Sequence, residues 1–405
     1  MADLLDLAER LWRGQASTEE HHPLFGEVDA AEVGAGVLFV RAFGNVTAVR
    51  ADDGLVLVDA GSAMTAAQVH QRVRAWSEEP VRTVVLTHGH VDHVLGLGPF
   101  EAEGTRPRVV AHEDVARRFD RYRRTAGYNA AVNARQFGVP GLSWPTEYPA
   151  LDETYRHRLE VSGLELRHAR GETDDATWVW APDRGVLCTG DLFIWAFPNA
   201  GNPQKVQRYP AEWAAALREM AGLGAEVLLP GHGWPILGAG RVRRALEETA
   251  EALEIVSGQT VRLMNEGRPL GEILERVRVP ERLLERPYLW PVYDDPEFAV
   301  RTVWRLEGGW WDGDPASLKP APDAAVAAEV ASLAGGAGAL ARRAREVAEA
   351  GDLRLAGHLA EWAWLAAPDD DEVRAVRASV LDRRAATEPS LMARNLFRAI
   401  SPQPG

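Results

Sequence analysis

The sequence predicts an α/β domain followed by an all-α region, and three observations support this division. From Gly34 to about Gly240, short aliphatic and β-branched runs alternate with helical patterns. From Arg241 onward the strand patterns stop, and apolar residues recur at helical spacing. With 405 residues, the chain is longer than one ordinary core requires. We therefore expect two domains, at residues 1–245 and 246–400.

Apolar patterning and turn residues predict the elements of the first domain in order. Residues 1 to about 20 are expected to form a surface helix, with Leu4, Leu11 and Trp12 on its apolar side. The predicted strands are 37–40, 45–49, 55–58, 81–86, 108–111, 164–168, 177–180, 185–188 and 226–229. An Asp-Gly turn at residues 53–54 joins the second and third of these strands. Helices are predicted at 65–76, 114–122 and 211–221.

The second domain is expected to contain helices only. They are predicted at 241–256, 258–267, 270–276, 296–304 and 323–333, before a glycine-rich break at 334–338. Residues 345–381 resemble one helix-turn-helix repeat of the tetratricopeptide type. Because one repeat cannot bury its own apolar face, this segment should stack on its neighbours.

Composition excludes several classes of function. The net charge of −14 argues against nucleic acid or an anionic membrane surface as a partner. Cys188 is the only cysteine, so an intramolecular disulfide, a four-Cys zinc module and a four-Cys iron–sulfur cluster are excluded. We find no signal-peptide pattern at the N-terminus and no run of 18 apolar residues, and we predict a cytoplasmic protein without a membrane span.

Metal-capable side chains gather in the run Thr87-His88-Gly89-His90-Val91-Asp92-His93, directly behind the apolar residues 84–86. Imidazole nitrogens and a carboxylate oxygen suit zinc, or iron or manganese. One loop supplies only part of a dinuclear site, so further ligands must come from other strand ends. Three positions beside glycine follow predicted strands, where the backbone can approach an ion closely: Glu172, Asp191 and His232.

This series of motifs resembles the metallo-β-lactamase superfamily over residues 20–245, with Val58-Asp59-Ala60-Gly61 matching an early structural aspartate. The resemblance implies a four-layer αββα sandwich and two divalent metal ions, with Zn²⁺ preferred over iron or manganese. It assigns His88, His90 and Glu172 to one ion and Asp92, His93 and His232 to the other. Asp191 would bridge the two ions.

A glutamate at position 172, where most superfamily members place a histidine, resembles the alkylsulfatase branch. Residues 245–400 are similar to the helical dimerisation domain of that branch, through Leu289-Trp290, the tryptophan-rich run 308–315 and Ala350-Gly351-Asp352. The resemblance implies a homodimer.

The motifs together predict a dinuclear metallohydrolase of a small anionic ester, with a sulfate ester first. A lactone, thioester or phosphoester hydrolase is the alternative, and a non-catalytic dimeric binding protein is a third hypothesis. Asp92, Asp191 and Tyr128 are expected to take part in catalysis, with Tyr128 or a metal-bound water protonating the leaving alkoxide. The expected substrate-binding residues are Asn129, Lys205 and Arg208, of which Lys205 or Arg208 anchors the anion. Solvated surface positions are the alternative for these side chains.

Overall fold

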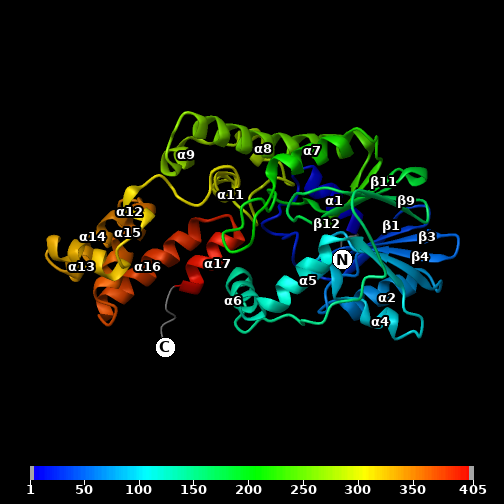
Figure 1. The fold of residues 1–405 in the computed structure, drawn as a ribbon, viewed down its shortest axis with the longest axis horizontal. Coiled ribbons are helices and arrows are strands. Elements are labelled where there is room, and N and C mark those ends of the chain that lie inside the picture. The colour runs from blue at the N-terminus through cyan, green and yellow to red at the C-terminus, as the bar shows by residue number, and fades with distance from the viewer. Residues whose placement is uncertain (1–3, 401–405) are drawn as a thin grey trace.

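The computed structural model describes residues 4–400 and places two β-sheets face to face at one end of an elongated molecule (Figure 1). The first sheet has seven strands in chain order: Asp29–Gly34 (β1), Val37–Arg41 (β2), Val46–Ala51 (β3), Gly54–Val58 (β4), Val81–Val85 (β5), Arg108–His112 (β6) and Glu153–Tyr155 (β7). The second sheet has six, ordered β13-β12-β11-β10-β9-β8: Arg158–Val161 (β8), Leu164–His168 (β9), Thr177–Ala181 (β10), Val186–Ile194 (β11), Val227–His232 (β12) and Ile236–Leu237 (β13).

Apolar side chains fill both faces of the first sheet. In β4, Val56 and Val58 belong to the core between the sheets, whereas Leu55 and Leu57 pack on the opposite side with Val69 of helix α2 (Ala66–Trp76). This alternation follows from the two-residue period of a strand. Parallel strands buried on both faces need continuous apolar runs, which explains why β4 and β5 were predictable.

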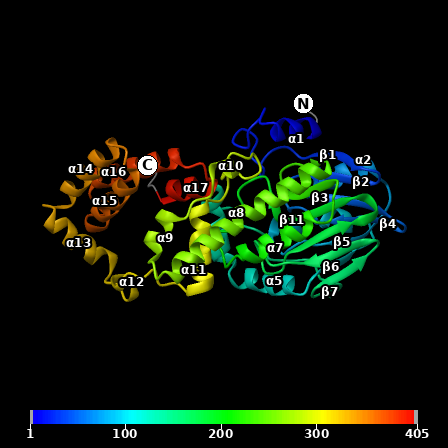
Figure 2. The same ribbon diagram turned by 90° about the horizontal axis from the view of Figure 1, so that it is seen from above.

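Helices cover the outer faces of the two sheets, which gives the predicted αββα order (Figure 2). Helices α7 (Pro210–Ala221) and α8 (Ala239–Asn265) pack together beside the second sheet, and Trp213 and Leu217 of α7 join its core. Three short elements lie near the first sheet: α3 (Val91–Val94), α4 (Gly98–Glu101) and α5 (Asp114–Arg124). The N-terminal helix α1 (Leu4–Trp12) buries Leu4, Ala8 and Leu11. The predicted sandwich is confirmed.

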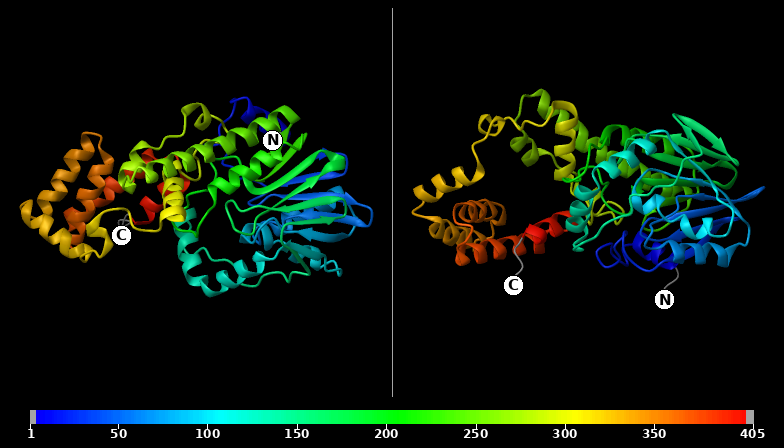
Figure 3. Two further views of the ribbon diagram at one scale, coloured as in Figure 1. Left: turned by 45° about the horizontal axis from the view of Figure 1, so that its top comes forward. Right: turned by 60° about the horizontal axis from the view of Figure 1, so that its bottom comes forward.

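The second half is helical, as predicted. Its helices are Leu270–Arg276 (α9), Glu281–Leu284 (α10), Pro296–Gly308 (α11), Pro315–Leu318 (α12), Asp323–Leu333 (α13), Ala337–Glu349 (α14), Leu353–Ala366 (α15), Asp371–Thr387 (α16) and Leu391–Ile400 (α17). Helices α13 to α16 share a separate apolar core, whereas α17 returns to the helix α6 (Ala126–Phe137) of the first half (Figure 3). In residues 4–400 no individual helix has the length and apolarity to cross a bilayer; α13 and α14 meet that test only when counted together, across an 85° bend.

Two predictions about elements need correction. The helices predicted at 241–256 and 258–267 are one helix, α8, because Gly258 is tolerated inside it while Val256 and Thr260 are buried. A glycine in a helix costs about 1 kcal/mol, which such packing offsets. Residues 126–137, for which no helix was predicted, form α6. The domain boundary after residue 245 stays a prediction; helix α8 spans this position, and the core between the sheets continues to Val303 of α11.

Candidate dinuclear metal centre

The loop that follows β5 is held in place by Asp59, which lies directly after β4. Asp59 is buried and has a left-handed backbone, with φ of 61°. Its carboxylate accepts hydrogen bonds of 2.7 Å from both the backbone N and Oγ1 of Thr87, and its Oδ2 lies 2.8 Å from Nδ1 of His93. Since a carboxylate can only accept, Nδ1 of His93 carries the proton and Nε2 is free to bind a metal.

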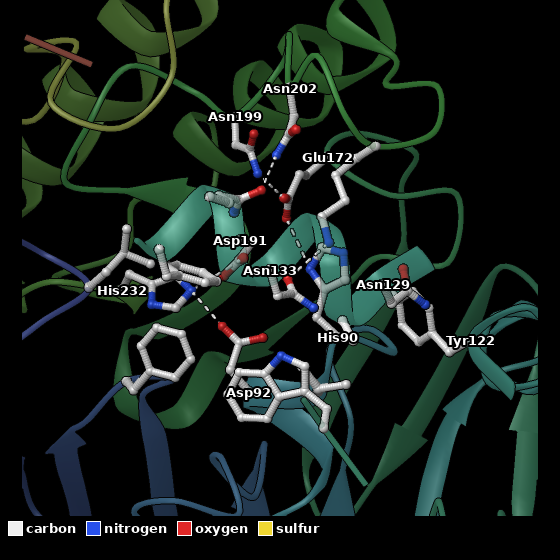
Figure 4. Close-up of a pocket in the computed structure, with 18 of the residues that line it drawn as sticks. His90, Asp92, Tyr122, Asn129, Asn133, Glu172, Asp191, Asn199, Asn202 and His232 are labelled. Carbon is white, nitrogen blue, oxygen red and sulfur yellow. Dashed lines mark hydrogen bonds and ion pairs between the residues drawn. The ribbon is translucent and has the colours of Figure 1, made fainter. Parts of the chain in front are cut away.

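The first group of ligand atoms comes from His88, His90, Glu172 and Asp191, all within 4.8 Å of one another. Nδ1 of His90 lies 3.6 Å from Oε2 of Glu172, and Nε2 of His88 lies 3.6 Å from Oδ2 of Asp191. The two imidazole nitrogens face each other at 2.8 Å. Figure 4 shows His90, Glu172 and Asp191 converging from different strand ends.

Asp92, His93 and His232 form the second group. Nε2 of His232 lies 3.4 Å from Oδ2 of Asp92 and 3.4 Å from Nε2 of His93. Asp191 lies between the groups: its Oδ1 is 3.2 Å from His93 Nε2, and its Oδ2 is 3.4 Å from His232 Nε2. One carboxylate thus reaches both sets of ligands, as a bridging ligand must.

The donor atoms fit a pair of divalent cations. Ligands held ~2.1 Å from a tetrahedral ion lie roughly 3.4 Å apart, and the oxygen–nitrogen distances around Asp191 are 3.2–3.6 Å. Oε2 of Glu172 is buried and accepts no hydrogen bond from residues 4–400. A buried carboxylate oxygen without a donor is costly unless a cation occupies the space it faces.

The two central carboxyl groups have opposite pKa shifts. Burial raises the pKa of Glu172 well above its usual range, and the neighbouring Asp191 carboxylate raises it further. Burial also favours neutral Asp191, but His232, His93 and His88 outweigh burial and hold the pKa of Asp191 well below its usual range. The centre therefore concentrates negative charge at the bridging position.

A cavity of about 880 Å³, its open mouth included, lies over the two ligand groups. One wall is aromatic: Phe43 stacks on Trp144 with ring centroids 6.0 Å apart, and Phe137 meets Phe43 edge-on at 5.6 Å. The centroid of the Phe43 ring is 6.2 Å from that of His232, so this wall borders the second group. The polar part of the lining includes Asn129, Asn133, Asn199, Asn202, Lys205 and Arg208.

The structure places the three expected substrate-binding residues in two different environments. Asn129 and Lys205 line the cavity. Arg208 also lines it, but is only 2% exposed and donates hydrogen bonds to backbone oxygens, so the alternative of a solvated surface position does not apply to Arg208.

Tyr128 is the one expected catalytic residue that the structure places outside the cavity. Its side chain is 58% exposed, and its hydroxyl donates to the backbone O of Gln204 at 3.4 Å. Successive residues of a helix point about 100° apart. Because Asn129 of α6 faces the cavity, Tyr128 turns toward solvent, and the expected role of Tyr128 as proton donor is not supported.

Several cavity residues escaped sequence analysis, among them Asn133, Gln136 and Tyr293. Asn129, Asn133 and Gln136 have the spacing of one helix face, which would have revealed them had α6 been predicted. Nε2 of Gln136 donates to Tyr293 Oη at 2.5 Å, and Nδ2 of Asn395 in α17 donates to the backbone O of Gln136 at 2.9 Å. The helical half therefore forms part of the cavity wall.

The helical half also supports the loop that carries Asn199 and Asn202. Asp294 is buried and accepts a 2.6 Å hydrogen bond from the backbone N of Gly201. Burial raises the pKa of Asp294 to about 7. A Cβ atom at Gly201 would lie 2.2 Å from the backbone N of Ala299, so only glycine permits this close approach.

Comparison with known families agrees with this two-part architecture. Residues 40–232 match the metallo-beta-lactamase superfamily, and residues 270–403 match the alkyl sulfatase dimerisation family. A linear primary-alkylsulfatase from Pseudomonas sp. is 27% identical over 378 residues, covering 86% of this chain and 72% of that protein. An (R)-specific secondary-alkylsulfatase from Pseudomonas sp. is 26% identical over 391 residues, covering 87% of this chain and 58% of that protein.

Among solved structures, the stereoselective inverting sec-alkylsulfatase Pisa1 from Pseudomonas sp. superposes with a TM-score of 0.81 at 24% identity. The match covers 91% of this chain and 64% of Pisa1, so the chain spans less than two thirds of that relative's length. The chain combines a metallo-β-lactamase superfamily domain with an alkyl sulfatase dimerisation domain.

Proposed function

We propose that this chain is a metal-dependent hydrolase of a sulfate ester. The observation that carries the proposal is the juxtaposition of two ligand groups sharing Asp191 with a half-buried cation, Lys205, in the wall of the same cavity. Nζ of Lys205 donates to Asn133 Oδ1 at 3.2 Å and forms no ion pair with a carboxylate of residues 4–400. An ammonium group that is partly removed from water and has no carboxylate partner favours an anionic ligand. The alkylsulfatase relatives support sulfate as that anion.

His88, His90 and Glu172 would hold one ion, Asp92, His93 and His232 the other, and Asp191 would contact both. Zn²⁺ is our first choice, and iron or manganese would suit the same donor atoms. When bound, such ions supply a water of pKa about 7 as nucleophile and polarise the scissile ester.

The chain's own residues would bind and orient the ester. Lys205 has three N–H donors, of which one is used by Asn133, so the others are available to sulfate oxygens. Burial lowers the pKa of Lys205 to about 8, which leaves the group mostly charged at neutral pH. Asn129 adds a polar contact on the same side, and the organic group would pack on Phe43, Phe137 and Trp144.

We also propose that the protein is a homodimer, which the alkyl sulfatase dimerisation domain supports. A cytoplasmic location remains our prediction, supported by the single cysteine, Cys188, which is buried.

A substrate panel tests the function directly. Protein loaded with Zn²⁺ should hydrolyse alkyl or aryl sulfate esters faster than matched phosphate esters, lactones or thioesters. Asp191→Ala should lose both turnover and bound metal, whereas Asp183→Ala, in an exposed turn, should keep both. If the protein hydrolyses a lactone, thioester or phosphoester but no sulfate ester, its function is hydrolysis of that other substrate. If Asp191→Ala keeps full metal content and full turnover, the proposed metal centre is wrong.

A further inference from the structure

The guanidinium group of Arg208 contacts other residues of the protein through each of its three nitrogens. It is 2% exposed and lies between the cavity loop and helix α7. Its Nη1 donates to the backbone O of Val206 at 2.7 Å, and its Nε donates to the backbone O of Asn199 at 3.3 Å. Its Nη2 lies 3.5 Å from Oε1 of Glu172. Each of the three guanidinium nitrogens therefore has a partner within the protein, and these contacts use three of the five N–H donors.

The two oxygens of Glu172 have different environments. Oε1 accepts a hydrogen bond from Nδ2 of Asn199 and faces Arg208. Oε2 accepts none, and lies 3.6 Å from Nδ1 of His90 and 4.0 Å from Nε2 of His88. One oxygen is fixed by the protein, and the other is left for a metal.

The charges around Glu172 also distinguish its two oxygens. Besides the histidine ligands, Arg208 is the only basic residue of the described chain in ion-pair contact with Glu172. A guanidinium stays charged at any ordinary pH, whereas the Asn199 amide is neutral. When Glu172 is ionised, as a metal ligand would be, Glu172 and Arg208 together carry no net charge, which is the charge of a neutral imidazole ligand.

We propose that Arg208 is a positioning residue of the metal centre, which fixes Glu172 Oε1 directly and through Asn199 so that Oε2 alone binds metal. The inference rests on the proposed dinuclear site and replaces our expectation that Arg208 anchors the substrate anion. Arg208 also offsets the negative charge that Glu172 adds to the ligand set. Lys205 is then the cation left for the substrate.

A mutant cycle in metal binding tests the pairing without any substrate. Zn²⁺ affinity would be measured by competition with a chelator, and metal content by elemental analysis, for Arg208→Gln, Glu172→His and the double variant. In the wild-type background, Arg208→Gln should lower the affinity for one of the two Zn²⁺ ions roughly 10–100-fold, as loss of a ligand's hydrogen-bond partner does. In the Glu172→His background the same change should have little effect, because a neutral ligand needs no compensating cation. Arg170→Gln, in an exposed ion pair with Glu212, is the matched control.

The outcomes separate this role from the alternatives. If Arg208→Gln lowers Zn²⁺ affinity equally in both backgrounds, or in neither, the proposed pairing of Arg208 with Glu172 is wrong. Full metal content in Arg208→Gln with a raised KM and unchanged kcat would instead assign Arg208 to substrate binding and overturn the proposal. If Arg208→Gln does not fold, Asn199→Ala removes the other contact to Oε1 and should also weaken one equivalent. Because the metal-binding cycle uses no sulfate ester, failure of the proposed function leaves its result interpretable.

Discussion

Replacing Asp59 by asparagine should impair metal binding without touching a ligand. The carboxylate of Asp59 accepts from Thr87 N, Thr87 Oγ1 and His93 Nδ1. An asparagine side chain has one acceptor oxygen, and we expect that oxygen to keep the hydrogen bond from the backbone N–H of Thr87. The amide nitrogen then faces His93 Nδ1 as a donor, so Nδ1 must accept and the imidazole proton moves to Nε2, the atom that faces the second ligand group.

The expected loss of metal affinity in Asp59→Asn follows from the changed tautomer of one ligand, His93. Second-sphere changes of this type weaken metal binding about 10–100-fold, which corresponds to about 1.4–2.7 kcal/mol. Disruption of buried, charge-assisted hydrogen bonds should also lower the free energy of unfolding by about 1–3 kcal/mol. The left-handed backbone adds little to this effect, because asparagine tolerates the φ of 61° at this position.

The assay is a chelator-competition titration with Zn²⁺, followed by thermal unfolding of the metal-loaded protein. Asp183→Asn, in an exposed turn, is the matched control. Two equivalents of Zn²⁺ bound to Asp59→Asn at wild-type affinity would refute the argument that Asp59 sets the tautomer of His93.

Three further predictions concern the cavity wall. Since the pKa of Asp294 is raised to about 7 in the folded state, the native protein binds this proton more tightly than the unfolded chain. Wild-type stability, measured as the urea midpoint, should therefore fall relative to Asp294→Asn as pH rises from about 4 to 7; parallel profiles would contradict this. Lys205→Gln should raise KM for a sulfate ester about 10–100-fold, with metal content unchanged; a lower kcat at constant KM would contradict the binding role. Gly201→Ala should cost about 1–3 kcal/mol by overpacking against Ala299, whereas Gly240→Ala, with open space around it, should not lower the unfolding temperature.

The ligand positions could be predicted because their signals are local. Each one lies within or shortly after a strand whose apolar run is visible in the sequence. Residues 88–93 follow β5 of the first sheet, whereas Glu172, Asp191 and His232 lie in or just after strands of the second sheet, which packs face to face with the first. The structure brings together all seven side chains that the motifs single out. Their ligand roles stay predictions until a metal is measured.

Much of the substrate side of the site could not be predicted, because weak helix formers interrupt the four alanines of α6. Gly127 and the asparagines at 129 and 133 are weak helix formers. Packing against α17, more than 250 residues later in the chain, supplies the stabilisation that the local sequence lacks. The same limitation hid Tyr293, whose place in the wall depends on contacts between the two halves.

The link from Asn395 through Gln136 to Tyr293 has a consequence for how the protein matures. All seven ligand positions lie in the first 232 residues, so they emerge from the ribosome long before α17 does. The ligand positions are therefore synthesised well before the helix that completes the cavity wall. Because Asn395 of α17 holds Gln136, and Gln136 contacts Tyr293, this part of the wall is complete only when α17 has docked.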